Sequence, residues 1–207
     1  MSAGSFPSAT KRMFDVATAL TGLVLLAPLF VAVAAWIRLD SPGPVFFRQE
    51  RVGRGGVPFR IHKFRTMRVA AGSPGPAITV GADSRITRAG AFLRRTKLDE
   101  LPQLIDVLRG DMSVVGPRPE LPQYVAAYPP ELRAKVLSVR PGITDPASLQ
   151  FRDESTLLAR AADPEREYRD VVLPAKLRLA ADYVDQATLA GDLRLIAATL
   201  RALWSRP

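Results

Sequence analysis

Two adjacent carboxylates, Asp99 and Glu100, are the side chains of this 207-residue sequence best suited to chemistry. Adjacent carboxylates on a helix point in different directions, so one can act as a nucleophile while the other serves as a base or a metal partner. Ordinary acidic charge at the N-terminus of a helix is the alternative explanation. The pair lies where the charge along the chain changes sign. It follows a basic segment without acidic residues, which contains Arg85, Arg88, Arg94, Arg95 and Lys97.

A helix is expected around this pair, because apolar residues recur there at helical spacing, at Leu98, Leu101, Leu104, Ile105 and Leu108. Pro102 is best tolerated in a first turn, and Thr96 is expected to cap the helix. Asp99 and Glu100 then fall in the first turn. There the helix dipole and the unpaired backbone N–H groups favour carboxylates or a bound phosphate.

A second feature follows about eighteen residues later, where Arg118 lies between Pro117 and Pro119. Both prolines fix their own φ angles, and Pro119 also restricts Arg118. A stiff loop that presents one guanidinium group can hold a phosphate or carboxylate through two hydrogen bonds. The segment from Arg140 to Thr144 offers a weaker version of the same arrangement.

Composition narrows the chemistry further. The chain has no cysteine and a single histidine, His62, which excludes disulfides, thiolate nucleophiles and sites rich in Cys or His. Covalent or acid–base chemistry must therefore come from carboxylates, lysines, hydroxyls or a metal ion bound by oxygen. Lys and Arg outnumber Asp and Glu by 29 to 20, a net charge of +9, so the expected partners are anionic: nucleic acid, phospholipid headgroups or phosphorylated metabolites.

The segment from Met13 to Leu39 is long and apolar. The 22 residues from Val16 to Ile37 carry no charge, and as a helix they would extend about 33 Å, close to the ~30 Å hydrocarbon core of a bilayer. A secretory signal peptide and a buried core helix are the alternatives. The apolar run continues well past the possible cleavage site at 32–34, and basic residues follow it, so a membrane segment is favoured.

The topology of this segment depends on Pro28 and on the flanking charges. Basic residues precede it at Lys11 and Arg12 and follow it at Arg38, Arg48, Arg51 and Arg54. Both ends therefore prefer the cytoplasm under the positive-inside rule. A helix kinked at Pro28 can enter the membrane and return to the same side. A single straight span is the alternative.

The rest of the chain is predicted to be an α+β catalytic domain with more helix than sheet. Residues 45–67 are expected to form a β-hairpin around the turn Gly53–Gly56, and residues 69–83 a loop. Helices are expected at 129–139 and 156–183. A final helix at 192–204 could be a core helix or lie on the membrane. The predicted organisation is a tail at 1–12, a re-entrant membrane helix at 13–39 and the catalytic domain at 40–207.

Several long motifs occur in one order: KRMFD, SPGPVFFRQERVGRGGVPFRIHKFRTM, RITRAGAFLRRTKLDELPQL, GDMSVVGPRPELPQY and VRPGITDPASLQF. With these motifs the sequence closely resembles the bacterial sugar transferases known as monotopic phosphoglycosyl transferases, of the small type that carries only the catalytic core. One departure stands out. The family often has a Gly-Trp pair after the PGIT motif, whereas this chain has Asp145-Pro146-Ala147-Ser148.

The resemblance implies transfer of a sugar-1-phosphate from a UDP-sugar to undecaprenyl phosphate in the bacterial inner membrane, with release of UMP at the cytoplasmic face. It implies that Asp99 is the covalent nucleophile of a ping-pong reaction and that Glu100 assists as a base or, with Asp99, through Mg²⁺. Lys63, Arg94 and Arg118 fall on family positions near the phosphates. Other partners would be membrane lipid and either a second copy of the chain or downstream glycosyltransferases.

Three alternatives remain at this stage. The same reaction could proceed by direct transfer in a ternary complex, with Asp99 only holding the metal. A non-catalytic membrane scaffold of the same fold would leave the Asp99-Glu100 pair without a role. A nucleic-acid-binding protein would explain the charge, but it would have no use for the apolar segment, and no nucleic-acid-binding motif is present, so nucleic acid is not an expected partner.

Overall fold

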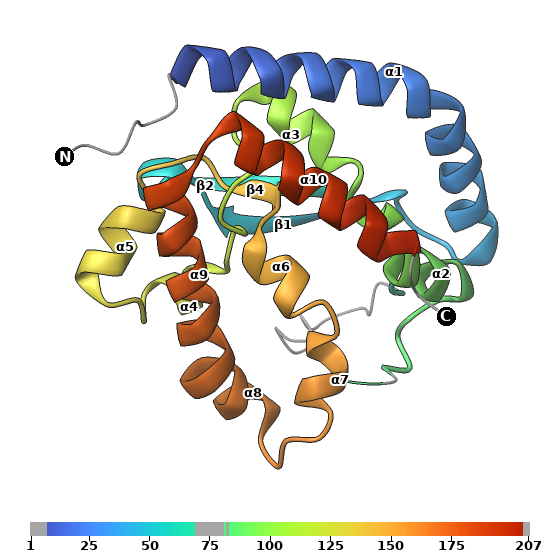
Figure 1. Cartoon of the computed structure of the whole chain (residues 1–207). Helices are drawn as coiled ribbons and strands as arrows, with labels where there is room; N and C mark the ends of the chain where they lie inside the picture. Colours follow the sequence, from blue (N-terminus) through green and yellow to red (C-terminus); the bar gives the residue numbers. More distant parts are fainter. Residues whose placement is uncertain (1–7, 69–80, 82, 205–207) are drawn as a thin grey trace.

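The computed structural model describes residues 8–68, 81 and 83–204, and the fold over these residues is α+β, mostly helical, with a long apolar helix at the N-terminus (Figure 1). This confirms the predicted fold class. Most of the loop predicted at 69–83 lies outside the described residues.

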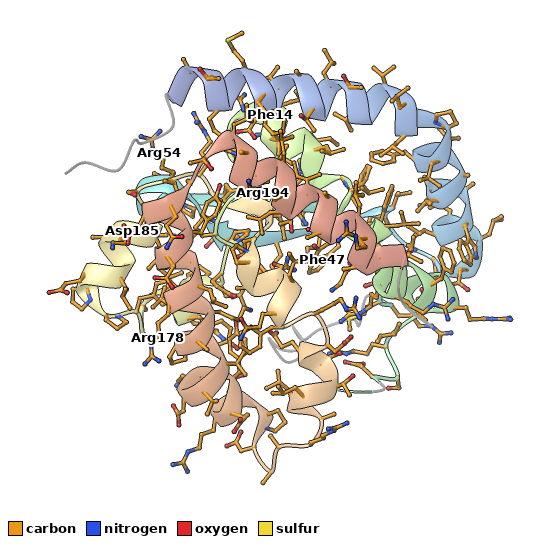
Figure 2. The ribbon with its side chains drawn as sticks, in the orientation of Figure 1. Phe14, Phe47, Arg54, Arg178, Asp185 and Arg194 are labelled. Carbon is orange, nitrogen blue, oxygen red and sulfur yellow. The ribbon has the colours of Figure 1, made fainter. Side chains whose placement is uncertain are left out.

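Helix α1 (Ser8–Asp40) is the longest element and begins before the predicted boundary at Met13. It is apolar and long enough to cross a membrane by length and composition. Figure 1 shows that α1 is bent into two arms. Pro28 is the one proline inside the helix, and a proline is the usual cause of such a bend. Side chains along its outer side project away from the rest of the molecule (Figure 2). Large apolar residues of α1 are exposed, including Leu20, Val24, Leu25 and Val31.

The two arms of α1 pack against different parts of the same body. In the first arm, Ala19 packs with Leu104 and Val107 of helix α3 (Gln103–Arg109). In the second arm, Val33 and Ile37 belong to a separate apolar cluster with Phe64 and Leu93. Both clusters exclude water between α1 and the catalytic domain, so the helix is part of the fold on both sides of its bend.

Hydrogen bonds also attach both ends of α1 to the catalytic domain. Near the start, Arg12 donates to the carbonyl oxygens of Val107 and Leu108 at 2.6 and 2.9 Å. At the far end, the buried Arg65 donates to the carbonyl oxygen of Ser41 at 2.7 Å. Asp40 accepts from the backbone N–H of Ala89 at 2.9 Å. The two arginines satisfy carbonyls at the ends of α3 and α1, and Asp40 satisfies an N–H in the first turn of helix α2 (Arg88–Thr96), groups that a helix end leaves unpaired. Together these bonds hold both ends of α1 against one domain.

The predicted β-hairpin is present. Strands β1 (Phe46–Val52) and β2 (Pro58–Phe64) pair antiparallel, with Phe46 opposite Phe64 and Val52 opposite Pro58. A 3-10 turn, η1 (Arg54–Gly56), joins them, and Gly55 and Gly56 adopt positive φ angles of 69° and 81°. Glycine adopts this conformation at little cost, which explains why the Gly-rich segment forms the turn.

A second, parallel pair of short strands, β3 (Ser113–Val115) and β4 (Gly142–Thr144), lies beside the hairpin. The backbone beyond β3 passes so close to β4 that a Cβ atom on Gly116 would lie 2.6 Å from the carbonyl oxygen of Arg140. Only glycine permits this approach. The segment Arg140–Gly142 therefore pairs with β3, and Arg140 donates to the carbonyl oxygen of Gly110 at 2.8 Å. The guanidinium of Arg140 is therefore used to hold the backbone and not to present an anion-binding site, as its sequence context had suggested.

The remaining helices form the other half of the molecule (Figure 1). The helix predicted at 129–139 is α5, but the one predicted at 156–183 is interrupted. Pro164 begins α8 and Pro174 lies in the first turn of α9. A proline is tolerated in a first turn and not further inside. The helices here are α4 (Pro122–Val125), α5 (Pro130–Val136), α6 (Pro146–Gln150), α7 (Glu154–Leu158), α8 (Pro164–Glu167), the π-helical turn η3 (Tyr168–Val172) and α9 (Leu173–Gln186).

The final helix, α10 (Leu189–Trp204), was predicted to be either a core helix or a helix on the membrane surface, and it has a face of each type. Leu195 and Ile196 pack against the apolar cluster that contains Ala19 of α1. Leu193 and Leu200 on the other side are 49% and 54% exposed. One face of α10 is thus a core face, and the opposite face is apolar and uncovered in the described part of the chain.

Candidate active site

Asp99 and Glu100 lie in a 3-10 turn, η2 (Leu98–Glu100), between helices α2 (Arg88–Thr96) and α3. Lys97 ends α2 with a φ of 57°, the one positive φ of a non-glycine residue in the described chain. A side chain in this region costs about 1 kcal/mol or more and often marks a functional site. The strained residue turns the chain so that the next two carboxylates point inwards.

This arrangement corrects the predicted helix at Leu98–Leu108. Thr96 does not cap it; its hydroxyl donates to the carbonyl oxygen of Phe92 at 2.9 Å, inside α2. Pro102 is the N-cap residue of α3, and no side chain caps that helix. Pro102 lacks an N–H and so cannot donate a helical hydrogen bond to the preceding turn. Helix α3 therefore begins after Pro102, although Leu101 and Pro102 keep helical φ and ψ angles, and Asp99 and Glu100 precede it.

Both carboxylates are buried, Asp99 to 8% exposure and Glu100 to 9%. Two cations hold Glu100. Lys63, on β2, donates to Oε1 at 2.8 Å, and Arg118 donates to both oxygens, at 2.5 and 3.2 Å. We call Lys63, Glu100 and Arg118 the Glu100 cluster. It joins the hairpin, η2 and the loop between two prolines that the sequence singled out.

The charges in this cluster shift one another's pKa values. Burial alone would raise the pKa of Glu100, but Arg118 and Lys63 outweigh it and hold that pKa well below its usual range. Glu100 in turn raises the pKa of Arg118. Burial lowers the pKa of Lys63, with Glu100 opposing the shift. Glu100 is therefore an ionised carboxylate with both oxygens engaged.

Asp99 differs from its neighbour because its Oδ1 atom is buried and has no hydrogen-bond partner in the described structure. Burial, and then the negative charge of Glu100, raises the pKa of Asp99 to about 6. Leaving a buried polar atom unpaired typically costs 1–3 kcal/mol. A carboxylate kept at this cost, with one oxygen free and a pKa near the working range, has the properties of a nucleophile or a metal ligand.

The third predicted phosphate-binding residue, Arg94, lies one turn before the end of α2 and does not join the Glu100 cluster. After Lys63, the charges of Lys97 and Arg94 also oppose the rise in the pKa of Asp99. Arg94 and Lys97 line an open groove of about 490 Å³, whose other described lining residues are Arg95, Arg152, Asp153, Ser155 and Thr156. We call this the basic groove.

Two buried acidic residues outside the predicted set lie next to the Arg118 loop and are candidates for a supporting, structural role. Asp145, at the position where the chain departs from its family's pattern, accepts from the backbone N–H of Arg118 at 3.1 Å and caps α6 by accepting from Ser148 at 2.7 Å. Its position directly before Pro146 is a cap signal in the sequence, but its bond to Arg118 leaves no such signal. The other candidate is Glu120, just beyond the Arg118 loop.

Glu120 lies in a second buried ion cluster. Its Oε1 accepts from Tyr168 at 2.8 Å and lies 3.3 Å from the ammonium of Lys176, while Oε2 lies 3.5 Å from a guanidinium nitrogen of Arg51. We call these four residues the Glu120 cluster. No spacing in the sequence predicts it, because Glu120 and Lys176 are 56 residues apart.

The described residues can hold a Mg²⁺ ion only if the substrate supplies most of its ligands. No group of three or more metal-binding side chains occurs among the described residues, and both oxygens of Glu100 are bonded to cations. The unpartnered oxygen of Asp99 is the available ligand. Mg²⁺ is commonly held by one or two carboxylates together with substrate phosphates, so this site fits an ion that arrives with a phosphorylated substrate.

Comparison with known proteins places this geometry in context. Residues 6–206 match the family model described as bacterial sugar transferase. Over 198 residues the chain is 40% identical to the UDP-glucose:undecaprenyl-phosphate glucose-1-phosphate transferase of Caulobacter vibrioides, covering 93% of this chain and 69% of the relative. It is 46% identical over 124 residues to a putative undecaprenyl-phosphate N-acetylgalactosaminyl 1-phosphate transferase of Bacillus subtilis, covering 60% and 69%.

A third relative is similar in length. The exopolysaccharide production protein PSS of Rhizobium leguminosarum is 40% identical over 199 residues, which cover 92% of each chain. The similarity therefore extends over α1, the hairpin, both carboxylates and the C-terminal helices.

Proposed function

The chain belongs to the bacterial sugar transferase family, and on that premise we propose that it transfers a sugar-1-phosphate from a UDP-sugar to undecaprenyl phosphate, with Asp99 as the covalent nucleophile. It is a transferase. The observation that carries the proposal is the unpartnered, buried Oδ1 of Asp99 beside a glutamate whose charge is already neutralised. One carboxylate is free to react, and the other is held in place.

In the first half of the reaction, an Asp99 oxygen attacks the β-phosphorus of the UDP-sugar. The bond from that phosphorus to the bridging oxygen breaks, and UMP leaves with the oxygen. In the second half, a phosphate oxygen of the lipid attacks the same phosphorus, and the bond to Asp99 breaks. Splitting one displacement into two easier steps is the usual gain of covalent catalysis.

The neighbouring residues have separate roles in this scheme. Lys63 and Arg118 orient Glu100 and place positive charge beside the phosphorus under attack. Asp99 and Glu100 are the residues that would hold Mg²⁺, which when bound supplies neutralisation of phosphate charge. A role for Glu100 as a base or ligand requires that one of its bonds to Lys63 or Arg118 be exchanged.

The test is a lipid-free reaction. Enzyme mixed with UDP-sugar and Mg²⁺ should release UMP stoichiometrically and retain the phosphosugar in a bond that hydroxylamine cleaves, as expected of an acyl phosphate. Asp99→Asn removes the anionic nucleophile, so both the UMP and the label should disappear. If wild-type enzyme releases UMP only after undecaprenyl phosphate is added, transfer is direct, and Asp99 is not the nucleophile.

We also propose that α1 enters the cytoplasmic leaflet and returns to the same side. Support comes from its bend and from the hydrogen bonds that attach both its ends to one domain. A straight span would break the hydrogen bonds at one end of α1. Cysteines at Thr10 and Pro42, both exposed, should be shielded from an impermeant thiol reagent in intact cells. Labelling of the Thr10 position from outside would contradict this topology.

Pro28→Ala tests the cause of the bend. If the missing N–H at Pro28 creates it, the variant should shift towards a straight span, and the cysteine at Thr10 should become accessible from outside. Unchanged labelling would mean that the contacts of the two arms with the domain set the topology.

A further inference from the structure

The basic groove has a composition suited to a phosphorylated ligand. Among its described lining residues are four basic side chains, Arg94, Arg95, Lys97 and Arg152, and one acidic side chain, Asp153. The remaining two, Ser155 and Thr156, carry hydroxyls. Its volume of about 490 Å³ is in the range of small-molecule sites, but its lining is charged rather than apolar, which fits an anion.

The groove has two walls that come from different parts of the chain. One wall is the end of α2 with Lys97, directly before the turn that carries Asp99. The other wall follows α6, and its Arg152 is held in place because its guanidinium donates to the carbonyl oxygen of Ala202 in α10 at 2.8 Å. A cation fixed in this way loses little conformational freedom when it binds an anion.

The groove lies beside the reacting carboxylate. Lys97 lines the groove and ends α2 directly before η2, the turn that carries Asp99, and Arg94 lies in the last turn of the same helix. Lys63 and Arg118, in contrast, are committed to Glu100. Lys97 and Arg94 of the groove are therefore the basic side chains near Asp99 that remain available to a second phosphate of the substrate.

The first wall of the groove, α2, packs on the second arm of α1 through Leu93, whereas the second wall lies away from the first arm. Figure 1 shows α7, which contains Ser155 and Thr156, at the opposite end of the molecule from the first arm of α1. The phosphate of a membrane lipid must stay close to α1, because its hydrocarbon chain remains in the bilayer. A water-soluble ligand has no such restriction.

From these observations we infer that the basic groove binds the UMP portion of the UDP-sugar, with Arg152 on its phosphate and the hydroxyls of Ser155 and Thr156 on its polar ribose or base. The inference rests on the proposed function. The groove would then be the site of the leaving group. As the bond from the β-phosphorus breaks, the bridging oxygen takes the electron pair and becomes a phosphate oxygen of UMP. Cations placed where this charge develops assist its departure.

Equilibrium binding of UMP to the full-length protein in detergent or nanodiscs tests the inference. Arg152→Ala should weaken UMP binding about ten- to a hundredfold, the usual effect of losing a charged hydrogen bond. The KM for the UDP-sugar should rise, whereas the KM for undecaprenyl phosphate should stay the same. Arg160→Ala is the matched control, because Arg160 is exposed just beyond α7 and does not line the groove.

A second variant separates binding from folding, since Arg152 also bonds to α10. The double substitution Ser155→Ala with Thr156→Val removes only the two side-chain hydroxyls and should weaken UMP binding severalfold. The inference is wrong if both groove variants bind UMP like wild type, or if Arg152→Ala raises the KM for the lipid instead. Wild-type protein that neither binds UMP nor releases it from any UDP-sugar would contradict the proposed function itself.

Discussion

Two buried glutamates, Glu100 and Glu120, are held in nearly the same way and yet serve different purposes. Each is about 8–9% exposed and lies between a lysine and an arginine from distant segments. Both have lowered pKa values, since their cations outweigh the effect of burial. Charge and burial alone therefore do not distinguish a reactive cluster from a structural one.

The difference lies in what remains unpaired. In the Glu120 cluster, Tyr168 and Lys176 engage the carboxylate of Glu120, and Lys176 also bonds to Glu154 at 3.0 Å; the atom left without a partner there is a donor, Nε of Arg51. In the Glu100 cluster, the adjacent Asp99 keeps an oxygen without a partner. The two arginines and lysines differ less: the Arg118 side chain is 27% exposed and that of Lys176 is 10% exposed, whereas Lys63 and Arg51 are both 17% exposed. An unpaired carboxylate oxygen can attack phosphorus and an unpaired guanidinium nitrogen cannot, and on this ground we propose that the reacting site lies at Asp99.

The largest effect is expected from Asp99→Asn. Turnover should fall by at least about a thousandfold, because the amide is not a nucleophile. Stability should not fall, since the substitution removes a buried charge whose pKa is raised to about 6. That shift corresponds to a gain of roughly 1–3 kcal/mol at neutral pH. Thermal unfolding measured beside the UMP assay checks both effects; a clear drop in Tm would mean that Asp99 has a structural role.

Glu120→Ala should lower stability and leave turnover largely intact, the reverse of Asp99→Asn. It leaves the Lys176 ammonium and the Arg51 guanidinium without their buried partner, and breaking a buried ion pair in this way costs about 3–5 kcal/mol. Folded protein should retain activity within severalfold of wild type, since Glu120 does not contact Asp99. Urea unfolding together with activity per folded molecule measures this. Loss of activity without loss of stability would place Glu120 in the reacting site.

A smaller contrast separates the two arginines. Arg118 contacts Glu100 through two nitrogens, whereas Arg51 approaches Glu120 through one nitrogen at 3.5 Å. Lysine cannot reproduce a two-nitrogen contact. Arg118→Lys should therefore lower kcat about tenfold, and Arg51→Lys should leave it nearly unchanged. Equal kcat values for the two variants would remove the geometric argument for Arg118.

The sequence predicted these two clusters unequally. The long uncharged apolar run located α1 and the Gly-rich turn located the hairpin, because both are local patterns. Among 29 basic residues, the two flanking prolines singled out Arg118, whereas Lys63 was selected only by the family resemblance. The Glu120 cluster was missed because its partners come from segments that only the tertiary fold brings together.

The helix boundary before the carboxylates was wrong for a related reason. The spacing of apolar residues from Leu98 to Leu108 continues through η2 and α3 without a break. The positive φ of Lys97 and the start of α3 after Pro102 interrupt the helix without disturbing that spacing. A residue strained by its tertiary surroundings leaves no signal in a hydrophobic pattern.

The contributions of Asp99 and Glu120 to stability should depend on pH with opposite signs. The folded-state pKa of Glu120 is lowered, so its contribution to stability is present above the unfolded pKa of about 4.5 and is lost only as the pH falls further. The folded-state pKa of Asp99 is raised to about 6, so its contribution is present below the unfolded value of 3.8 and is lost as the pH rises through about 6. Between pH 5 and 7, only Asp99 of these two titrates.

The last effect we predict follows from the titration of Asp99 between pH 5 and 7. The rate of lipid-free UMP release should fall roughly tenfold between pH 7 and pH 5, because about one Asp99 in ten remains ionised one unit below a pKa of about 6. The pyrophosphate of the UDP-sugar keeps its charge over this range, so the change reports the enzyme. Glu120→Gln should show the same pH profile with lower stability throughout. A flat profile, or a midpoint moved by Glu120→Gln, would mean that Asp99 is not the titrating group.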